Sequence, residues 1–246
     1  DEWPSIVAVI PARNELETIE RSVHSLLAQN YVGNIKVIVV DDNSNDGTAK
    51  AAGENPNLRI IGGQPLEQGW TGKLWAVHQG VLEIDQFFPY ADYVLLTDAD
   101  IEHHKENLSE LVYKAVTDNR HLVSLMVKLR CISIWEKLLI PTFVYFFQKL
   151  FPFPLVNSPT NDISAAAGGC MLIRLDTLRQ VGGIKAIKDR LIDDCALAAL
   201  IKKQGSIWLG LSERTISLRS YTDLSEIWMM VTRTAFVQLN YSILNL

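Results

Sequence analysis

The sequence is short of the features that mark several common protein classes. It contains only three cysteines, Cys131, Cys170 and Cys195, which are widely spaced and form no Cys-x-x-Cys pair. A disulfide framework and a zinc site are therefore not expected, and we expect reduced thiols on the cytosolic side. The 23 basic side chains are outnumbered by 28 acidic ones and form no long run, so the chain shows no charge pattern for binding nucleic acid.

Long hydrophobic runs are also missing. A membrane-spanning helix needs about 20 apolar residues, whereas the longest apolar stretch of the aromatic segment 131–155 runs only from Leu138 to Phe147. Basic residues lie close by, at Lys128, Arg130, Lys137 and Lys149. The segment is therefore typical of an amphipathic helix in the headgroup plane of a membrane. A core helix or a helix at a dimer contact explains it equally well.

The amino terminus lacks both an initiator methionine and a signal peptide. The chain opens with the residues DEWPS, without the basic and apolar regions that direct secretion. We therefore expect a trimmed piece of a longer protein, with room for flanking membrane helices outside it.

Apolar runs rich in valine and isoleucine alternate with segments of helical period. The predicted strands are residues 6–10, 35–40, 58–61, 93–97 and 121–129, and the predicted helices are residues 16–28, 48–52, 74–84 and 106–117. Repeated strand–helix units predict an α/β fold with a Rossmann-like, mostly parallel sheet and helices on both faces. No repeat or linker divides the chain, so we expect one domain over residues 1–246, with halves at 1–130 and 131–246.

Polar clusters follow the predicted strands, where an open parallel sheet binds its ligands. The first strand leads into Pro11-Ala12-Arg13-Asn14-Glu15, and the glycine-rich loops of dinucleotide-binding and P-loop proteins are absent there. The second strand ends in Asp41-Asp42, whose carboxylates can accept hydrogen bonds from a base or a ribose. A turn and helix cap is the structural alternative for the residues that follow.

The fourth strand ends in Thr97-Asp98-Ala99-Asp100. Carboxylates at i and i+2 on a tight turn suit Mg²⁺ or Mn²⁺ with positions left open for diphosphate oxygens. Such tripeptides are also common in surface turns, and His103 nearby is a weaker candidate for contact with the metal or donor. Lys73, which follows a flexible Gly-Trp-Thr-Gly loop, can hold a phosphate together with helix amides or be a solvated residue of the first helical turn.

Two further segments in the second half are candidates for the site. Gly168 and Gly169 belong to a run of small residues that allows close approach of the backbone to a ligand, although ordinary tight packing is an alternative. Asp193 and Asp194 open a predicted helix, and acidic residues in a first turn are normal partners of the helix dipole.

Taken together, PARNE, VVDDNSNDGT, GWTGK, LLTDAD, AAGGCMLIR and IDDCALAALIKKQG occur in an order and spacing that resemble the family 2 glycosyltransferases. The resemblance covers nearly the whole chain and implies a GT-A fold. Within that family, LIDDCALAALIKKQG and LSEIWMMVTRTAFVQLNYS look most like the membrane-bound glycosyltransferases associated with hopanoid biosynthesis.

The resemblance also implies roles for single residues. The nucleotide-binding half, 1–130, contributes a donor pocket formed by Pro11, Arg13, Glu15, Asp41, Asp42, Lys73 and Asp98. Asp98 and Asp100 hold the metal against the diphosphate, Asp194 is the general base of an acidic dyad with Asp193, and Gly168 and Gly169 border the donor sugar and the acceptor. Of the Gln-x-x-Arg-Trp motif of processive relatives only Arg233 is present, where it can neutralise a phosphate or pair with Asp194, so polymer synthesis is not supported.

The function implied is metal-dependent transfer of a sugar from a nucleotide diphosphate, with a UDP-sugar as the expected donor, to a hydroxyl of a lipid such as a hopanoid. A single carboxylate opposite the leaving group suits one displacement with inversion. We expect this at the cytoplasmic face of the cell membrane, with Mg²⁺ or Mn²⁺ as cofactor. The alternatives are a nucleotidyltransferase, disfavoured by PARNE after the first strand, and a catalytically silent membrane-associated binding or scaffold subunit.

Overall fold

The computed structural model describes residues 3–190, 193–221 and 223–238, apart from the side chains of Met230 and of residues 233–238. Within these residues one eight-stranded sheet has the strand order β3-β2-β1-β4-β7-β6-β8-β5. The strands are β1 (Ile6–Ala12), β2 (Ile35–Asp41), β3 (Leu58–Gly62), β4 (Tyr93–Thr97), β5 (Ile101–Glu102), β6 (Leu122–Lys128), β7 (Cys170–Arg174) and β8 (Ile207–Ser217).

The sheet is mostly parallel, as predicted. Strands β3, β2, β1 and β4 pair in parallel, and so do β6 and β8. Strand β7 lies antiparallel between β4 and β6, and β5 is antiparallel to β8. Because β7 runs in reverse, its first residue Cys170 pairs with Thr97, the last residue of β4. The residues before β7 therefore lie at the same edge of the sheet as the carboxyl ends of the parallel strands.

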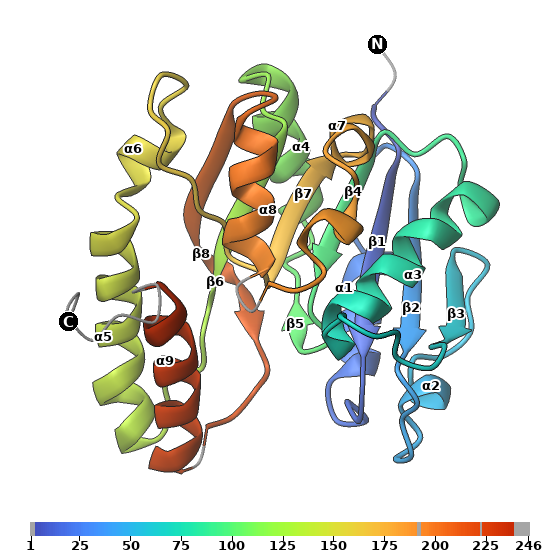
Figure 1. The fold of residues 1–246 in the computed structure, drawn as a ribbon. Coiled ribbons are helices and arrows are strands. Elements are labelled where there is room, and N and C mark those ends of the chain that lie inside the picture. Colours follow the sequence, from blue (N-terminus) through green and yellow to red (C-terminus); the bar gives the residue numbers. More distant parts are fainter. Residues whose placement is uncertain (1–2, 191–192, 222, 239–246) are drawn as a thin grey trace.

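Helices cover both faces of the sheet (Figure 1). They are α1 (Ile19–Leu27), α2 (Thr48–Ala51), α3 (Gly72–Phe87), α4 (Asn107–Thr117), α5 (Ile134–Leu150), α6 (Phe153–Asn157), α7 (Leu175–Gln180), the short 3-10 helix η1 (Ile184–Ile187), α8 (Asp193–Lys202) and α9 (Leu224–Gln238). Since successive side chains of a strand point to opposite faces, Ile6, Ala8 and Ile10 pack with α1 and α4, whereas Val7 and Val9 pack with α3 and η1.

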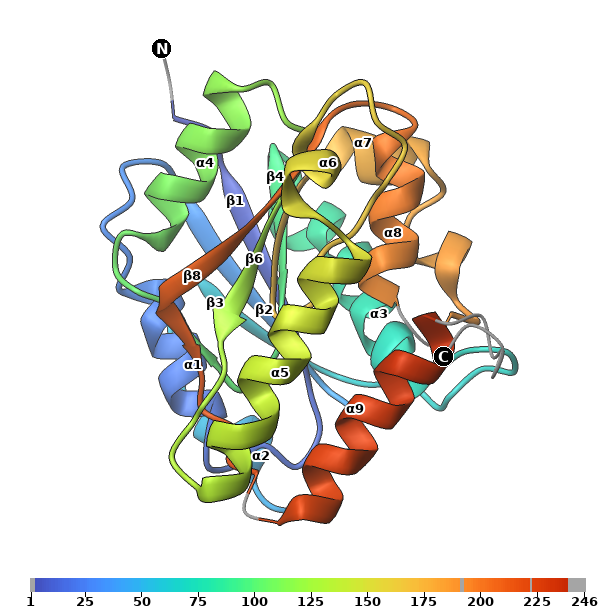
Figure 2. The ribbon, with the colours of Figure 1, turned by 90° about the vertical axis from the view of Figure 1, so that its left-hand side faces the viewer.

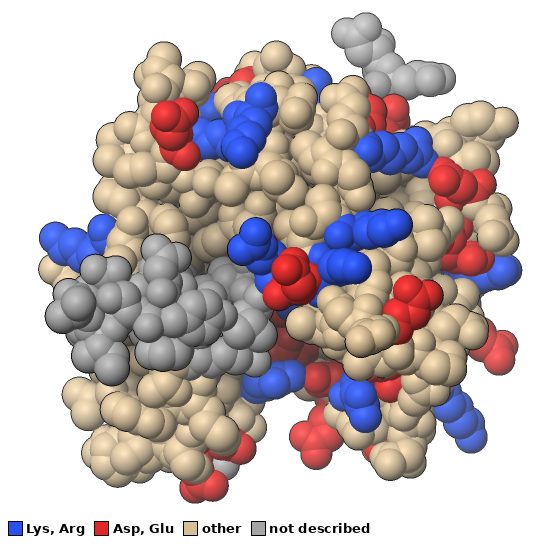
Figure 3. Space-filling view, viewed as in Figure 1, with Lys and Arg blue, Asp and Glu red and all other residues tan. Residues whose placement is uncertain are grey.

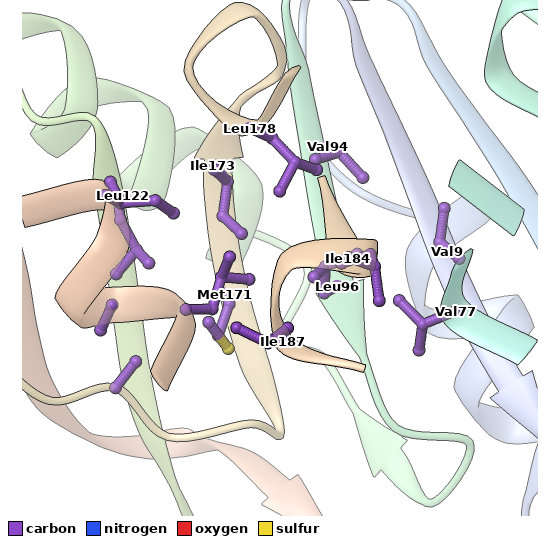
Figure 4. Packing of buried hydrophobic residues seen from close by; sticks show 14 of the residues in the cluster. Val9, Val77, Val94, Leu96, Leu122, Met171, Ile173, Leu178, Ile184 and Ile187 are labelled. Atoms are coloured by element: carbon purple, nitrogen blue, oxygen red, sulfur yellow. The ribbon is translucent and has the colours of Figure 1, made fainter. Parts of the chain in front are cut away.

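Helices α3 and η1 pack against the same face of the sheet. Figure 4 shows Ile184 and Ile187 of η1 close to Leu96 and Met171, and Val77 of α3 close to Val9. Helix α3 approaches the sheet so closely that a β-carbon at Gly80 would lie 2.5 Å from a methyl carbon of Val9. Glycine at this position therefore sets the distance between α3 and the sheet.

Helices α5 and α9 lie side by side along the edge of the molecule near β6 and β8 (Figures 1 and 2). The start of α5 is fixed by a capping box, in which Ser133 accepts from the amide of Glu136 and Glu136 accepts from the amide of Ser133. Burial opposes the charge of Glu136, but hydrogen bonds from the amides of Tyr221, Ser133 and Ile132 lower its pKa to about 2. None of the helices in the described residues is long and apolar enough to cross a membrane.

Candidate active site

The predicted site residues meet in one cleft of about 570 Å³ at the edge of the sheet where β1, β2 and β4 end. In Figure 3, basic and acidic side chains gather around the hollow at the centre of the molecule. The residues predicted for the site that line the cleft are Pro11, Arg13, Glu15, Asp42, Lys73, Asp98, Asp100, Gly168, Gly169, Asp193 and Asp194. Segments far apart in the sequence are thus brought together as the strand-end argument predicted.

Two predicted residues are not among those lining the cleft. Asp41 is the last residue of β2, and one of its carboxylate oxygens is buried without a hydrogen-bond partner among the described residues. Since neighbouring side chains at a strand end point in different directions, Asp42 faces the cleft and Asp41 does not. Arg233 belongs to α9, but its side chain lies outside the described part of the structure.

Asp42 and Arg13 form one end of the cleft. The Arg13 guanidinium lies 3.4 Å from the carboxylate of Asp42. Glycines flank this carboxylate, because a β-carbon at Gly63 or Gly72 would lie 3.4 or 3.5 Å from its oxygens. Because glycine has no side chain, the carboxylate of Asp42 and the guanidinium of Arg13 remain accessible beside open backbone. This combination of acceptor and donor suits a nucleoside.

Asp98 and Asp100 each have a basic partner. The ammonium of Lys73 lies 2.7 Å from Asp98, and the guanidinium Nε of Arg219 lies 3.4 Å from Asp100. Ser217 also donates its hydroxyl to Asp100 at 2.8 Å. Each of the two carboxylates therefore has a cation of the protein beside it, which offsets part of its negative charge.

The donor set of Asp98 and Asp100 fits Mg²⁺ or Mn²⁺ as a partial coordination shell. Among the described residues no group of three or more histidine, cysteine or carboxylate side chains is placed to hold a metal ion. Mg²⁺ is commonly bound in this incomplete way, through one or two carboxylates, substrate phosphates and water. The open cleft in front of Asp98 and Asp100 provides that space.

Lys73 is placed by the start of α3. Thr71 caps this helix by accepting from the amide of Leu74. Burial disfavours the ammonium charge, but Asp98, Asp193 and Asp194 outweigh burial and raise the pKa of Lys73. Lys73 therefore remains a cation in the middle of the acidic cluster.

Asp194 lies at the start of α8, and two backbone amides donate to its carboxylate. Gly168 donates to its Oδ2 at 2.9 Å, and Cys195 donates to its Oδ1 at 2.7 Å. Burial and the neighbouring charge of Asp193 raise the pKa of Asp194 to about 6, although both amides act in the opposite direction. A carboxylate poised near neutral pH is suited to accept a proton. A β-carbon at Gly168 would lie 3.4 Å from Oδ2, so the missing side chain allows this close contact.

The last residue of β8 and the segment between β8 and α9 contribute cleft residues that the sequence analysis missed: Ser217, Arg219 and Tyr221. The guanidinium of Arg219 lies 2.8 Å from Glu15 in addition to its contact with Asp100. Burial raises the pKa of Glu15, and Arg219 opposes that shift. The sequence did carry a signal for these residues. Ser217, Arg219 and Tyr221 alternate along the chain after the apolar start of β8, as side chains on one face do near the end of a strand.

An apolar wall forms the other side of the cleft. It consists of Met126, Val127, Leu129, Phe143 and Phe147, from β6, the residue after it and α5. A β-carbon at Gly169 would lie 3.3 Å from Val127, whereas one at Gly168 would lie 3.4 Å from Asp194. The two glycines therefore stand between the acidic side of the cleft and the apolar wall.

His103 lies beneath the cleft rather than in its lining. Its ring nitrogens contact Thr97 and Asn107 at 3.0 Å each, and burial lowers its pKa to about 3. Because the amide nitrogen of Asn107 donates to one ring nitrogen, the other carries the proton toward Thr97, whose hydroxyl donates to the carbonyl of Gly169 at 2.7 Å. The hypothesis that His103 contacts the metal or donor is wrong, since this neutral residue supports the glycine segment.

Comparison with known proteins places the chain in a family. The family model described as glycosyl transferase family 2 matches residues 7–182. A 4,4'-diaponeurosporenoate glycosyltransferase of Staphylococcus haemolyticus is 30% identical over 112 residues, which are 45% of this chain and 28% of the relative. The aligned part thus spans little more than a quarter of that relative's length.

Solved structures share the fold. The mannosyltransferase PcManGT from Pyrobaculum calidifontis, in complex with GDP-Man and Mn²⁺, has a TM-score of 0.66 at 18% identity, over 97% of this chain and 64% of that one. Glucosyl-3-phosphoglycerate synthase from Mycobacterium tuberculosis, in complex with Mn²⁺ and UDP-glucose, has a TM-score of 0.57 at 19% identity, over 96% and 78%. At these identities the likeness shows the fold alone, and the predicted GT-A fold is confirmed.

Proposed function

Because the chain belongs to glycosyl transferase family 2, we propose that it transfers a sugar from a nucleotide diphosphate to a hydroxyl of a lipid, with inversion at the anomeric carbon. The observation that carries this proposal is a single cleft with Asp98 and Asp100 on one side, the apolar wall on the other and Asp194 beside the glycines between them. Each part of the reaction has a matching part of that cleft.

The donor is proposed to lie on the acidic side, within the nucleotide-binding half of the domain. Asp42 and Arg13 would bind the nucleoside, with Pro11 and Glu15 adjacent and Lys73 toward the phosphates. Asp98 and Asp100 would hold Mg²⁺ or Mn²⁺, which when bound neutralises charge on the leaving diphosphate. The complexes of the two structural neighbours with Mn²⁺ and a nucleotide sugar support this arrangement, and we propose a UDP-sugar as donor.

Asp194 is proposed to take the proton of the attacking hydroxyl. Its carboxylate is oriented by the amides of Gly168 and Cys195, and its raised pKa makes it a better base than an ordinary aspartate. A double displacement would need a nucleophile of its own at the anomeric carbon. With Asp194 assigned to the acceptor, we propose a single displacement with inversion, in which Asp193 raises the basicity of Asp194 and Arg233 assists with phosphate charge.

The acceptor is proposed to be a lipid, with its apolar part along the apolar wall and its hydroxyl near Asp194. Phe143 and Phe147 supply aromatic surface for an apolar molecule. The name of the staphylococcal relative refers to a lipid-like acceptor, which supports this class. Within the class we propose a hopanoid, because the late segments of the chain resemble glycosyltransferases associated with hopanoid biosynthesis.

A membrane surface is proposed to lie against α5 and α9, at the cytoplasmic side of the cell membrane. Large apolar side chains are exposed on these helices: Ile134, Trp135, Leu138, Tyr145, Phe146, Leu150, Leu224, Trp228 and Met229. Because α5 also carries Phe143 and Phe147, one helix would connect the membrane surface with the apolar wall.

The test is a panel of UDP- and GDP-sugars with Mn²⁺, Mg²⁺ or EDTA, in vesicles with or without a hydroxylated hopanoid. We expect release of the nucleoside diphosphate, a glycosylated lipid by mass spectrometry and an inverted anomeric centre by NMR. Release of pyrophosphate would instead identify a nucleotidyltransferase. Failure of every donor to bind with either metal would favour a silent membrane-associated scaffold.

A further inference from the structure

The two carboxylates proposed to hold a metal are already paired with cations of the protein itself. Lys73 contacts Asp98, and Arg219 contacts Asp100 while also contacting Glu15. A divalent ion and Arg219 would therefore compete for the same carboxylate, Asp100. Such competition would weaken the binding of metal in the absence of a nucleotide.

The surroundings of Arg219 allow its side chain to move while its backbone stays. On one side the amide of Leu218 donates to the carbonyl of Asp100 at 2.7 Å, and on the other the amide of Tyr221 donates to buried Glu136 at 2.9 Å. The side chain of Arg219 is 50% exposed, whereas that of Asp100 is 10% exposed. Arg219 can thus leave Asp100 by rotation toward the cleft.

Lys73 differs from Arg219 in its hydrogen-bonding geometry rather than in exposure. Its side chain is 45% exposed, and its compact ammonium contacts one carboxylate, Asp98, at 2.7 Å. Arg219 is shared between Glu15 and Asp100, and a guanidinium has enough donors to keep one carboxylate while it turns another edge to a new acceptor. Of these two cations, Arg219 is the one that can change partner at low cost.

We propose that Arg219 is a resident counter-ion of Asp100 that gives up this carboxylate when a divalent metal and the donor diphosphate bind together, and then contacts the diphosphate. The inference rests on the proposed function. It makes metal and nucleotide binding cooperative, because the diphosphate supplies new acceptors for the displaced guanidinium. Metal alone must displace Arg219 without that compensation.

The experiment measures Mn²⁺ binding through the EPR signal of free Mn²⁺, without nucleotide and with UDP or GDP. In R219Q we expect Mn²⁺ alone to bind about threefold to tenfold more tightly than in the wild type. We also expect the nucleotide to tighten Mn²⁺ binding less than in the wild type. R214Q is the matched control, because Arg214 lies in β8, the strand that Arg219 follows, and pairs with Glu106 and Glu110 outside the cleft lining; it should match the wild type in both measurements.

A second variant keeps the test decisive if R219Q is unstable. R219K retains the charge but cannot bridge Glu15 and Asp100 with a planar fork, so Mn²⁺ alone should bind more tightly than in the wild type by a smaller factor. Mn²⁺ affinity equal to or weaker than wild type in the folded variant would overturn the inference, even if sugar transfer were lost, and would leave the transferase proposal intact. A wild-type protein that binds no Mn²⁺ with or without nucleotide would overturn both the metal dependence and this inference.

Discussion

The two sides of the cleft are built in different ways. The acidic side is made largely from short polar segments at the ends of β1, β2 and β4, so Arg13, Asp42, Asp98 and Asp100 each lie within a few residues of a strand that fixes them. The apolar wall is made from β6 and from one face of α5, a helix whose other face is exposed. The positions of these charged residues therefore follow from nearby sequence, whereas the apolar wall depends on how α5 packs against the rest of the protein.

The largest effect on transfer is expected at Asp194, which lies between the two sides of the cleft and tests whether they act together. In D194N the amide side chain cannot accept a proton, so we expect kcat to fall by about 10²- to 10⁴-fold. Binding of the nucleotide sugar should remain, since Asp42 and Arg13 are unchanged. Donor binding by calorimetry and transfer by nucleoside diphosphate release check this; near-wild-type transfer in D194N would remove the proposed base.

The pH profile of transfer is the next largest effect. The ionised form of Asp194 is the active one, and burial and Asp193 raise its pKa to about 6. Activity should therefore fall as pH drops below about 6, by about tenfold per pH unit in the limiting region. In D193N, loss of the neighbouring charge should lower the pKa of Asp194 and move the acidic limb to lower pH. An acidic limb that stays in place in D193N would contradict the assignment.

The same difference explains how far the sequence could be interpreted. The alternation of apolar runs and helical segments predicted the strands and their parallel pairing, and strand ends such as Asp98-Ala99-Asp100 pointed to the cleft. The reversed direction of β7 was not predicted, because a short run such as Met171-Leu172-Ile173 carries no information about which neighbours it joins. That direction is what brings Gly168 and Gly169 to the cleft.

Two sets of cleft residues were not predicted for a related reason. Arg219 follows a strand that was not recognised, and its partners Glu15 and Asp100 lie more than a hundred residues earlier in the chain. The aromatic segment 131–155 was predicted to be apolar on one face, but periodicity alone could not distinguish Phe143, which lines the cleft, from Phe146, which is exposed. Only the packing of α5 separates them.

This pair of phenylalanines gives a matched test of the apolar side. F143S should raise KM for a lipid acceptor about tenfold, because it removes an aromatic side chain from the wall. It should leave KM for the donor unchanged. F146S should instead weaken binding to vesicles by up to about tenfold, while a detergent-dispersed acceptor is used as well as by the wild type. Equal effects of both variants on both measurements would show that the wall and the outer face of α5 are not separate surfaces.

The smallest effect on transfer is expected from a position outside the cleft that connects the sheet to it. A β-carbon at Gly80 would lie 2.5 Å from a methyl carbon of Val9 and 2.9 Å from one of Val40, so G80A must push α3 away from the sheet. Overpacking of this kind lowers the free energy of unfolding by about 1–3 kcal/mol, and the better helix propensity of alanine offsets up to about 1 kcal/mol of it. Lys73 lies two turns earlier on the same side of α3, so the displacement should also loosen its contact with Asp98 and slow transfer modestly.

G62A is the control, since a β-carbon at Gly62 would meet no atom within 4 Å. Urea unfolding that gave G80A the same stability as G62A would show that α3 can shift freely. The acidic side would then be less rigidly fixed than its strand-end residues indicate.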